Sequence, residues 1–350
     1  MKNVKIHKSI VIILLIASVL AIDACTRRTL EEEYLETALI PVCIDWSISG
    51  ASLERMHRAS VWLFPLNGNA PLEFRLERDL TYQEISVPIG TYSVLVFNET
   101  VEANDWDAIV FSGTNRYETF AAMGISDAVR GFYTRSEDLP LLKNPDPLAA
   151  WSLNRFEVTL EMLNRTREIV RSYSPSYRDM LISEVPDLTI VKPLPRFERI
   201  QITAYVTNLY SSMQVTGTID GMAAGVYMVS GEMVPASAAH AFILNARVYD
   251  NNEKDGTTTR TFNIFGRLHG LTTQHLMNLD FLLVDGTLHP REEFDVTQLL
   301  ITRTDLIVNT HIINVGYDNN NGDHLIELPD MGMGAGISVD GWDEIVIPLQ

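Results

Sequence analysis

The sequence predicts a mainly β protein, built from two tandem antiparallel β-sandwich domains with a few short helices. Apolar and polar residues alternate with a period of two along most of the chain, as in Val42, Ile44 and Trp46. Turn-forming residues recur at intervals of about 8–15 residues, a spacing that suits antiparallel sandwiches. No regular alternation of strands with helices appears, which argues against a parallel sheet.

The first half contains seven expected strands and one expected hairpin. Asn67-Gly68 predicts a tight turn, because these residue types adopt the left-handed conformations that short hairpins require. Residues 114–151 are expected to be irregular, with a short helix over 121–129. The expected strands cover residues 42–46, 59–66, 72–76, 85–89, 93–98, 106–111 and 156–162.

Helices are expected over residues 163–182, with a break at Ser174-Pro175, because a proline costs ~3 kcal/mol inside a helix. A linker follows, marked by three prolines within ten residues: Pro186, Pro193 and Pro195. We therefore expect an N-terminal domain over residues 38–190 and a C-terminal domain over 191–350.

The second half repeats the strand pattern. Ile345, Ile347 and Leu349 share one face of the last strand, and Pro348 lacks the N–H that a central strand needs. These three apolar residues are the candidate partner-binding residues, in a donated strand or in a plain edge strand of the second sandwich. The expected strands cover residues 200–206, 215–219, 241–249, 260–267, 278–284, 306–315 and 342–349.

The N-terminus predicts a lipoprotein. Residues 1–24 combine three lysines with an apolar run over 10–21, which is too short to cross a membrane and suits a signal peptide. Ala24 precedes Cys25, and this ending resembles the bacterial lipobox, in which the cysteine thiol is acylated after cleavage. Cleavage by an ordinary signal peptidase near Ala24 is the alternative. Residues 25–37 are polar and form a tether.

Charge excludes one class of partner. The chain has 45 acidic and 27 basic residues, for a net charge of −18. Such a surface repels phosphate backbones, so nucleic acid is not expected as a partner. The mean hydropathy of +0.04 excludes a polytopic membrane protein.

No motif for catalysis, a cofactor or a metal is present, so we expect neither an enzyme nor a bound cofactor. His269 and His275 are the closest histidine pair, and their spacing suits neither one helix face nor one strand face. Two oxygen-rich loops, 250–256 and 318–323, are candidates for calcium or, more simply, for turns, since Asn and Asp tolerate left-handed conformations.

Aromatic residues leave a second class of function open. Trp106 and Trp151 lie near expected loops, where indole rings can stack on sugars, whereas the other tryptophans lie in strand patterns. A surface glycan-binding lipoprotein is therefore the alternative function.

Several short motifs, in order along the chain, resemble the Bacteroidetes fimbrillin-like lipoproteins, in particular the FimB-type minor subunits that anchor fimbriae. They cover nearly the whole chain after the tether: residues 42–46, 61–65, 87–92, 95–98, 221–225, 294–297 and 341–345. The resemblance implies two transthyretin-like sandwiches and a surface-exposed, lipid-anchored protein of the outer membrane. It also implies fimbrial structural subunits as partners.

Subunits of that family polymerise by donating a strand to a neighbour, and structural subunits first lose a leading segment by cleavage after an arginine. Here cleavage at Arg27, Arg28, Arg55 or Arg58 would separate the chain from its lipid. The resemblance therefore leads to the hypothesis that this chain stays uncleaved and sits at the fimbrial base.

Overall fold

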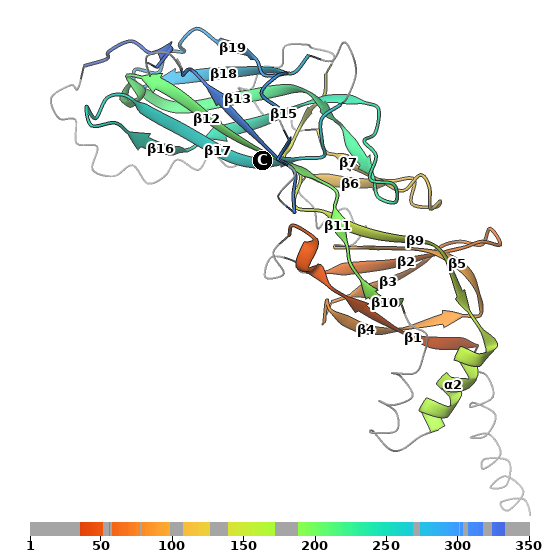
Figure 1. Ribbon diagram of the computed structural model, residues 1–350. Coiled ribbons are helices and arrows are strands. Elements are labelled where there is room, and N and C mark those ends of the chain that lie inside the picture. Colours follow the sequence, from red (N-terminus) through yellow and green to blue (C-terminus); the bar gives the residue numbers. More distant parts are fainter. Residues whose placement is uncertain are drawn as a thin grey trace, which may run out of the picture.

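Figure 1 shows the computed structural model of the chain. The structure describes residues 36–51, 56, 58–77, 79–98, 108–126, 139–171, 188–268, 274–300, 302–303, 307–317 and 324–332. Strands dominate these residues, and the only α-helix among them is α2 (Leu160–Arg171). The expected all-β sandwich fold is confirmed.

The first sandwich pairs a three-stranded sheet with a five-stranded sheet. Their orders are β10-β1-β4 and β11-β9-β5-β2-β3. The strands are β1 (Thr37–Ile44), β2 (Ala59–Pro65), β3 (Leu72–Leu76), β4 (Tyr82–Pro88), β5 (Gly90–Phe97), β9 (Ala149–Val158), β10 (Leu188–Val191) and β11 (Leu194–Pro195). The predicted boundary between residues 190 and 191 falls within β10.

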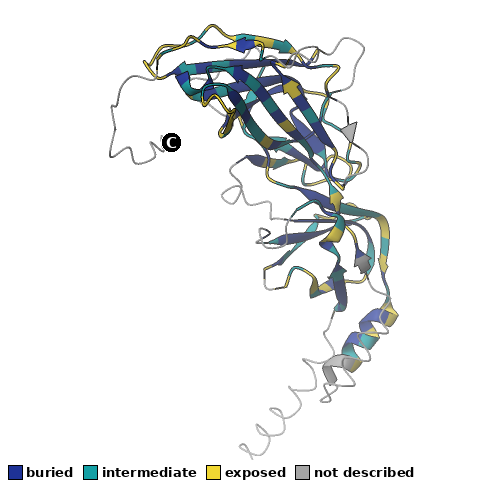
Figure 2. Cartoon of the chain, turned by 60° about the vertical axis from the view of Figure 1, so that its left-hand side comes forward, coloured by how far each residue is buried: buried dark blue, intermediate teal, exposed yellow. Residues whose placement is uncertain are grey.

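The second sandwich has sheets of order β16-β17-β12-β21-β20 and β19-β18-β13-β15-β8, with β22 beside β12. Its strands are β8 (Leu141–Leu142), β12 (Glu198–Thr207), β13 (Ser212–Ala223), β15 (Ser237–Leu244), β16 (Ala246–Tyr249), β17 (Gly256–Ile264), β18 (Leu276–Leu283), β19 (Glu292–Asp295), β20 (Thr302–Arg303), β21 (Thr310–Val315) and β22 (Ile326–Glu327). Figure 2 shows buried residues along the strands and exposed residues gathered in the connecting loops.

Most strand pairs are antiparallel, but four parallel pairs occur among the described residues: β1 with β10, β12 with β21, β12 with β22, and β15 with β8. The two strands of each pair come from parts of the sequence that are far apart. Parallel neighbours need a long connection, and here the intervening chain passes through other strands of the molecule. Local periodicity cannot reveal such pairings.

A small third sheet, β14-β7-β6, lies between the sandwiches (Figure 1). It consists of β6 (Ile109–Ser112), β7 (Ala121–Gly124) and β14 (Gly225–Tyr227), and the last of these comes from the second half of the chain. The predicted helix over 121–129 is therefore wrong for residues 121–124. Strand β7 instead pairs with β6 on one edge and with β14 on the other.

An aromatic core joins the two halves. Phe120 is fully buried, and its ring centroid lies 5.3 Å from that of Trp62 and 5.5 Å from that of Phe97. The same core includes Val226 and Phe265 of the second half, both fully buried. Because β2 and β5 face this core on one side and the first sandwich core on the other, both strands read as nearly continuous apolar runs.

Helix α2 begins where the sequence pattern predicts a strand. The alternation through Leu160 and Met162 predicts a strand to residue 162, but β9 ends at Val158 and the helix starts at Leu160. The expected helix over 163–182 is confirmed as far as Arg171; residues 172–187 lie outside the described part. Met162 and Leu163 are buried in the first core, so this turn of the helix packs against the sandwich.

Candidate functional site

Strand β1 fills a groove in the first sandwich. Its alternate side chains Ala38, Ile40, Val42 and Ile44 point into the core and are 0–5% exposed. Burying an aliphatic side chain of this size stabilises a fold by about 1.5–3 kcal/mol. Loss of β1 would therefore open an apolar groove along the whole length of the first sandwich.

The two edges of β1 have different neighbours. The Ile44 N–H donates to the Thr81 carbonyl at 2.8 Å, on the side of β4, and the Asp45 N–H donates to the Val191 carbonyl at 2.8 Å, on the side of β10. Because backbone donors alternate along a strand, even-numbered residues of β1 direct their N–H groups to β4 and odd-numbered residues direct theirs away from it.

Helix α2 completes the edge that β10 leaves open. Among the residues that the structure describes, β10 pairs with β1 from Val42 onward. Nearer the start of β1, the Leu39 N–H donates instead to Thr166 Oγ1 of α2 at 2.7 Å, and that hydroxyl donates to the Met162 carbonyl at 2.9 Å. Thr166 is 4% exposed, so this helix residue takes the place of a strand partner in the interior.

Pro41 lies at the gap between these two contacts. It is an odd-numbered residue, so its missing N–H belongs on the side away from β4. At this position neither the Leu39–Thr166 contact nor the β10 pairing requires a donor. A proline is therefore compatible with this central strand at this one register position.

The far end of β1 is fixed by the short 3-10 helix η2 (Trp46–Ile48). The Trp46 indole Nε1–H donates to the Leu80 carbonyl at 2.7 Å. Asp45 Oδ1 accepts from the Ser47 N–H at 3.0 Å. Hydrogen bonds from Ser47, and then Lys192 at 3.4 Å, hold the pKa of Asp45 below its ordinary value.

The residues singled out for lipid attachment and strand donation lie outside the described residues. These are Ala24, Cys25, Ile345, Ile347 and Leu349. Lipid attachment and strand donation thus stay predictions. Among the described residues, no helix has both the length and the apolar character needed to cross a bilayer.

One of the two oxygen-rich loops is described, and its polar atoms form a turn. Asn252 Oδ1 accepts from the N–H groups of Lys254 and Asp255 at 3.0 and 2.9 Å. Asp255 Oδ1 accepts from the Asn208 N–H at 2.8 Å. Within the described residues, no group of three His, Cys, Asp or Glu side chains could hold a metal ion. Residues 318–323 lie outside this part of the chain.

The loop at 250–256 contacts His324, which follows the other oxygen-rich segment in the sequence. His324 Nε2 lies 3.6 Å from Asp250 Oδ2. Tyr317 and His324 form an isolated antiparallel β-bridge through their backbones. The Tyr205 ring stands 4.7 Å from Tyr317 and 5.6 Å from His324, between centroids. The sequence does not predict that these distant segments meet.

The two tryptophans considered for sugar stacking have different positions. Trp151 belongs to β9, is half-buried and packs against the first core. Trp106 lies outside the described residues. His275 is buried, and its Nδ1 lies 3.3 Å from the Asp220 carbonyl; His269 is not described.

The family model described as "Domain of unknown function (DUF5119)" matches residues 24–242, well over half of the chain. The chain belongs to this family. No curated protein matches it.

One solved structure shows the same fold as this DUF5119 member, and two others are similar over much of the chain. A "putative adhesin" from Bacteroides ovatus ATCC 8483 is 17% identical, with a TM-score of 0.54, over 84% of this chain and 93% of that one. A second structure of that description, from Bacteroides thetaiotaomicron, is 8% identical, with a TM-score of 0.43, over 75% and 82%. A fimbrial assembly protein from Parabacteroides distasonis ATCC 8503 is 11% identical, with a TM-score of 0.36, over 79% and 90%. At these identities, the first similarity shows the fold.

Proposed function

We propose that this protein is an outer-membrane lipoprotein of a fimbrial assembly, and that it anchors the fibre by donating its C-terminal strand to a fimbrial subunit. The acylated Cys25 would hold the chain on the cell surface. The domain over residues 38–190 would keep β1 in its groove, and the domain over 191–350 would carry the donor strand. The descriptions of the similar Bacteroides and Parabacteroides proteins are consistent with this role.

The observation that carries the proposal is a match between β1 and the C-terminal segment. Residues 39–42 read Leu-Ile-Pro-Val, and residues 346–349 read Val-Ile-Pro-Leu. Aligning the two sequences matches Ile345, Ile347 and Leu349 with Ala38, Ile40 and Val42, the residues of β1 that point into the core. It also brings Pro348 onto Pro41, the position of β1 that needs no backbone donor.

Side-chain size points to a second molecule as the recipient. The position of Ile345 in this alignment is that of Ala38, which is fully buried. Three additional carbon atoms at such a position would overpack the core, at about 1–3 kcal/mol. The C-terminal segment therefore suits a related groove in another subunit better than the groove of its own first sandwich.

Retention of β1 gives the assembly a direction. A chain whose lipid precedes β1 cannot lose β1 and stay attached to the membrane. Its own groove remains filled, so it can donate a strand and cannot accept one. Such a subunit occupies one end of a fibre, which is the position that an anchor requires.

The test is recovery of fimbrial subunits with the intact lipoprotein from outer membranes, measured by mass spectrometry after antibody capture. Ile347→Asp puts a charge on the inward row and should lower recovery at least tenfold. Val346→Asp, on the opposite face, is the matched control and should retain recovery. Full recovery with Ile347→Asp would refute strand donation, and an unmodified Cys25 in the N-terminal peptide would refute lipid anchoring.

A further inference from the structure

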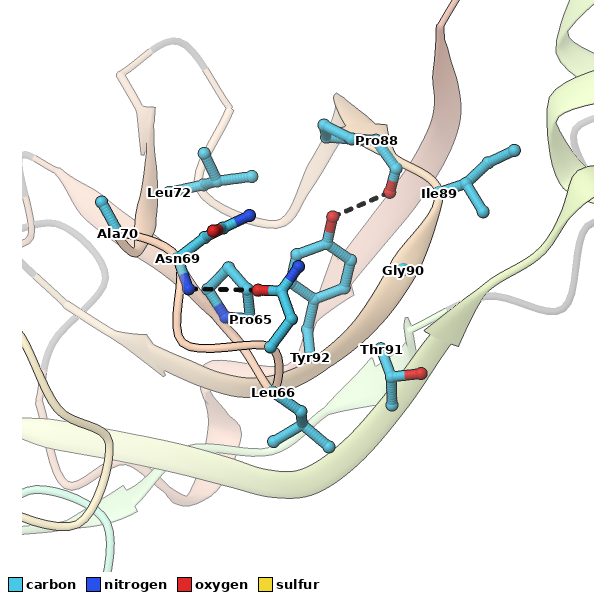
Figure 3. A pocket seen from close by; sticks show the side chains of 11 residues that line it. Pro65, Leu66, Asn69, Ala70, Leu72, Pro88, Ile89, Gly90, Thr91 and Tyr92 are labelled. Carbon is cyan, nitrogen blue, oxygen red and sulfur yellow. Dashed lines mark hydrogen bonds between the residues drawn. The ribbon is translucent and has the colours of Figure 1, made fainter.

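A pocket opens at the end of the first sandwich where β1 begins. It has a volume of about 500 Å³ and lies between the β2–β3 turn and the β4–β5 turn (Figure 3). Its walls are mainly apolar: Pro65, Leu66 and Leu72 come from one turn and its flanking strands, and Pro88, Ile89 and Tyr92 come from the other. Pockets of this size accept a large side chain or a small ligand.

The pocket presents apolar surface next to a fixed aromatic ring. Tyr92 is 4% exposed, and its hydroxyl donates to the Pro88 carbonyl at 2.9 Å, so its ring is held beside the pocket (Figure 3). A Cβ at Gly90 would stand 3.2–3.3 Å from the Tyr92 ring and hydroxyl, so glycine permits this close packing. Leu66 and Ile89 are 57% and 48% exposed, leaving apolar surface at the mouth.

The described chain begins beside this pocket. Thr37, the first residue of β1, pairs with Pro88, which lines the pocket, and Glu36 is the first described residue. The inward row of β1 consists of even-numbered residues. Continued backward, that row passes through Glu36, which is exposed, to Tyr34, about 13 Å from Ala38 at ~3.3 Å per residue.

We propose that Tyr34 of the tether occupies this pocket. Its ring would lie against Pro65, Pro88 and the Tyr92 ring, and its hydroxyl would remain at the mouth near Asn69, whose side chain is exposed. Tyrosine suits such a place because it buries about 150–250 Å² while its hydroxyl keeps a polar partner. This proposed contact between Tyr34 and the pocket goes beyond the anchoring role, because it does not depend on whether Cys25 carries lipid.

Docking of Tyr34 would change how β1 is held. Hydrogen bonds and packing fix the strand from Thr37 onward, and the seated ring would add a fixed point ahead of it. Nine Cα–Cα steps, from Cys25 to Tyr34, would then separate Cys25 from the first fixed residue, instead of the twelve steps from Cys25 to Thr37. Nine steps have a reach of about 30 Å at ~3.4 Å per residue.

The test is disulfide trapping in residues 25–350, with both natural cysteines replaced (Cys25→Ser and Cys43→Ala). Glu32→Cys, on the same row as Tyr34, and Asn69→Cys place one thiol just before Tyr34 and the other at the mouth. With Tyr34 present, we expect a disulfide to form at least ten times faster than with Tyr34→Ala. Tyr34→Phe should retain the fast rate, and Leu35→Ala, beside it on the opposite face, is the matched control.

Two outcomes would overturn the proposal. Equal trapping rates with and without Tyr34 would mean that the ring does not hold the tether there. A trapping rate that rises with protein concentration would mean that a second copy supplies the occupant. Hydrogen exchange gives an independent check that needs no new thiol. Tyr34→Ala should speed exchange at residues 89–92 and leave β12 unchanged, and unchanged exchange at 89–92 would also count against the proposal.

Discussion

The backbone N–H of Leu39 in β1 donates to the side-chain hydroxyl of Thr166 in α2, across 127 residues of sequence. A helix residue thus completes the edge of a strand whose other edge pairs continuously with β4. The contact lies just before Pro41, at the part of β1 that β10 does not reach. Helix α2 is therefore part of the groove that holds β1.

Removing this hydroxyl should loosen β1. Thr166→Val keeps the shape of the side chain but leaves the Leu39 N–H without an acceptor, at a cost of about 1–3 kcal/mol in the free energy of unfolding. Urea denaturation measures the loss, and hydrogen exchange should speed up at Leu39. Thr166→Ser keeps the hydroxyl and loses one buried methyl group, so it should cost only about 0.8 kcal/mol. A valine variant as stable as the serine variant would contradict this role.

Proline should be tolerated at one position of β1 and excluded at the next. Pro41→Ala introduces a backbone N–H at a buried position where the described neighbours offer no acceptor, and it should cost about 1–3 kcal/mol in the free energy of unfolding. Ile40→Pro removes an N–H that faces β4 and should cost about 3 kcal/mol more than Ile40→Ala, which removes the side chain alone. Equal effects of Ile40→Pro and Ile40→Ala on thermal unfolding would contradict the alternation of donors described here.

The aromatic core should couple the two sandwiches. Phe120→Ala leaves a cavity among the Trp62, Phe97 and Phe111 rings and should cost about 3–5 kcal/mol. It should also broaden the distribution of particle dimensions in small-angle scattering, because the halves lose a shared core. Phe281→Ala, at a fully buried site in the second core, is the matched control. That variant should be destabilised to a similar extent without the change in scattering.

Acid should weaken the second sandwich through His240. This residue of β15 is fully buried between Ile219 of β13 and Leu142 of β8, and burial lowers its pKa to about 4. Its pKa in the unfolded chain is about 6.5. Between pH 6.5 and pH 4, His240 binds a proton in the unfolded chain but not in the folded protein. The free energy of unfolding is therefore not reduced by this group above pH 6.5, and it falls as the pH drops toward 4, by about 3 kcal/mol in total.

Denaturant titrations at a series of pH values measure this effect. The His240→Leu variant has no group that titrates at this position, so the part of the slope between pH 6.5 and 4 that belongs to His240 should disappear. Carboxylates contribute mainly below that range. An unchanged slope in the leucine variant would show that other groups cause the acid sensitivity.

Local pattern predicts most strands and some of their bounds. The strand expected at 72–76 is confirmed as β3, and the Asn67-Gly68 turn precedes it. Tertiary packing overrides the pattern at Leu160 and Met162, where alternation predicts a strand and the chain forms a helix. Residues 121–124 carry no local strand signal, and one of their two partner strands, β14 (Gly225–Tyr227), lies about a hundred residues away.

The candidate site was predicted only in part. The alternation at Val42 and Ile44 correctly predicts a strand, and Pro348 predicts an edge strand or a donated strand. Pro41 shows that a strand with neighbours on both sides can hold a proline where a gap falls between its hydrogen-bond partners. That gap arises from Thr166 and Val191, which no local sequence signal connects to β1.

The path of the chain between the sandwiches has a mechanical consequence. After β5 the chain passes to β7 and β8, which pair with strands of the second half, returns as β9, and crosses again into β12. Tension between the two ends of such a chain cannot simply extend one hinge. It must separate β8 from β15, β7 from β14 and the rings of the aromatic core from one another at the same time. These contacts therefore share the tensile load.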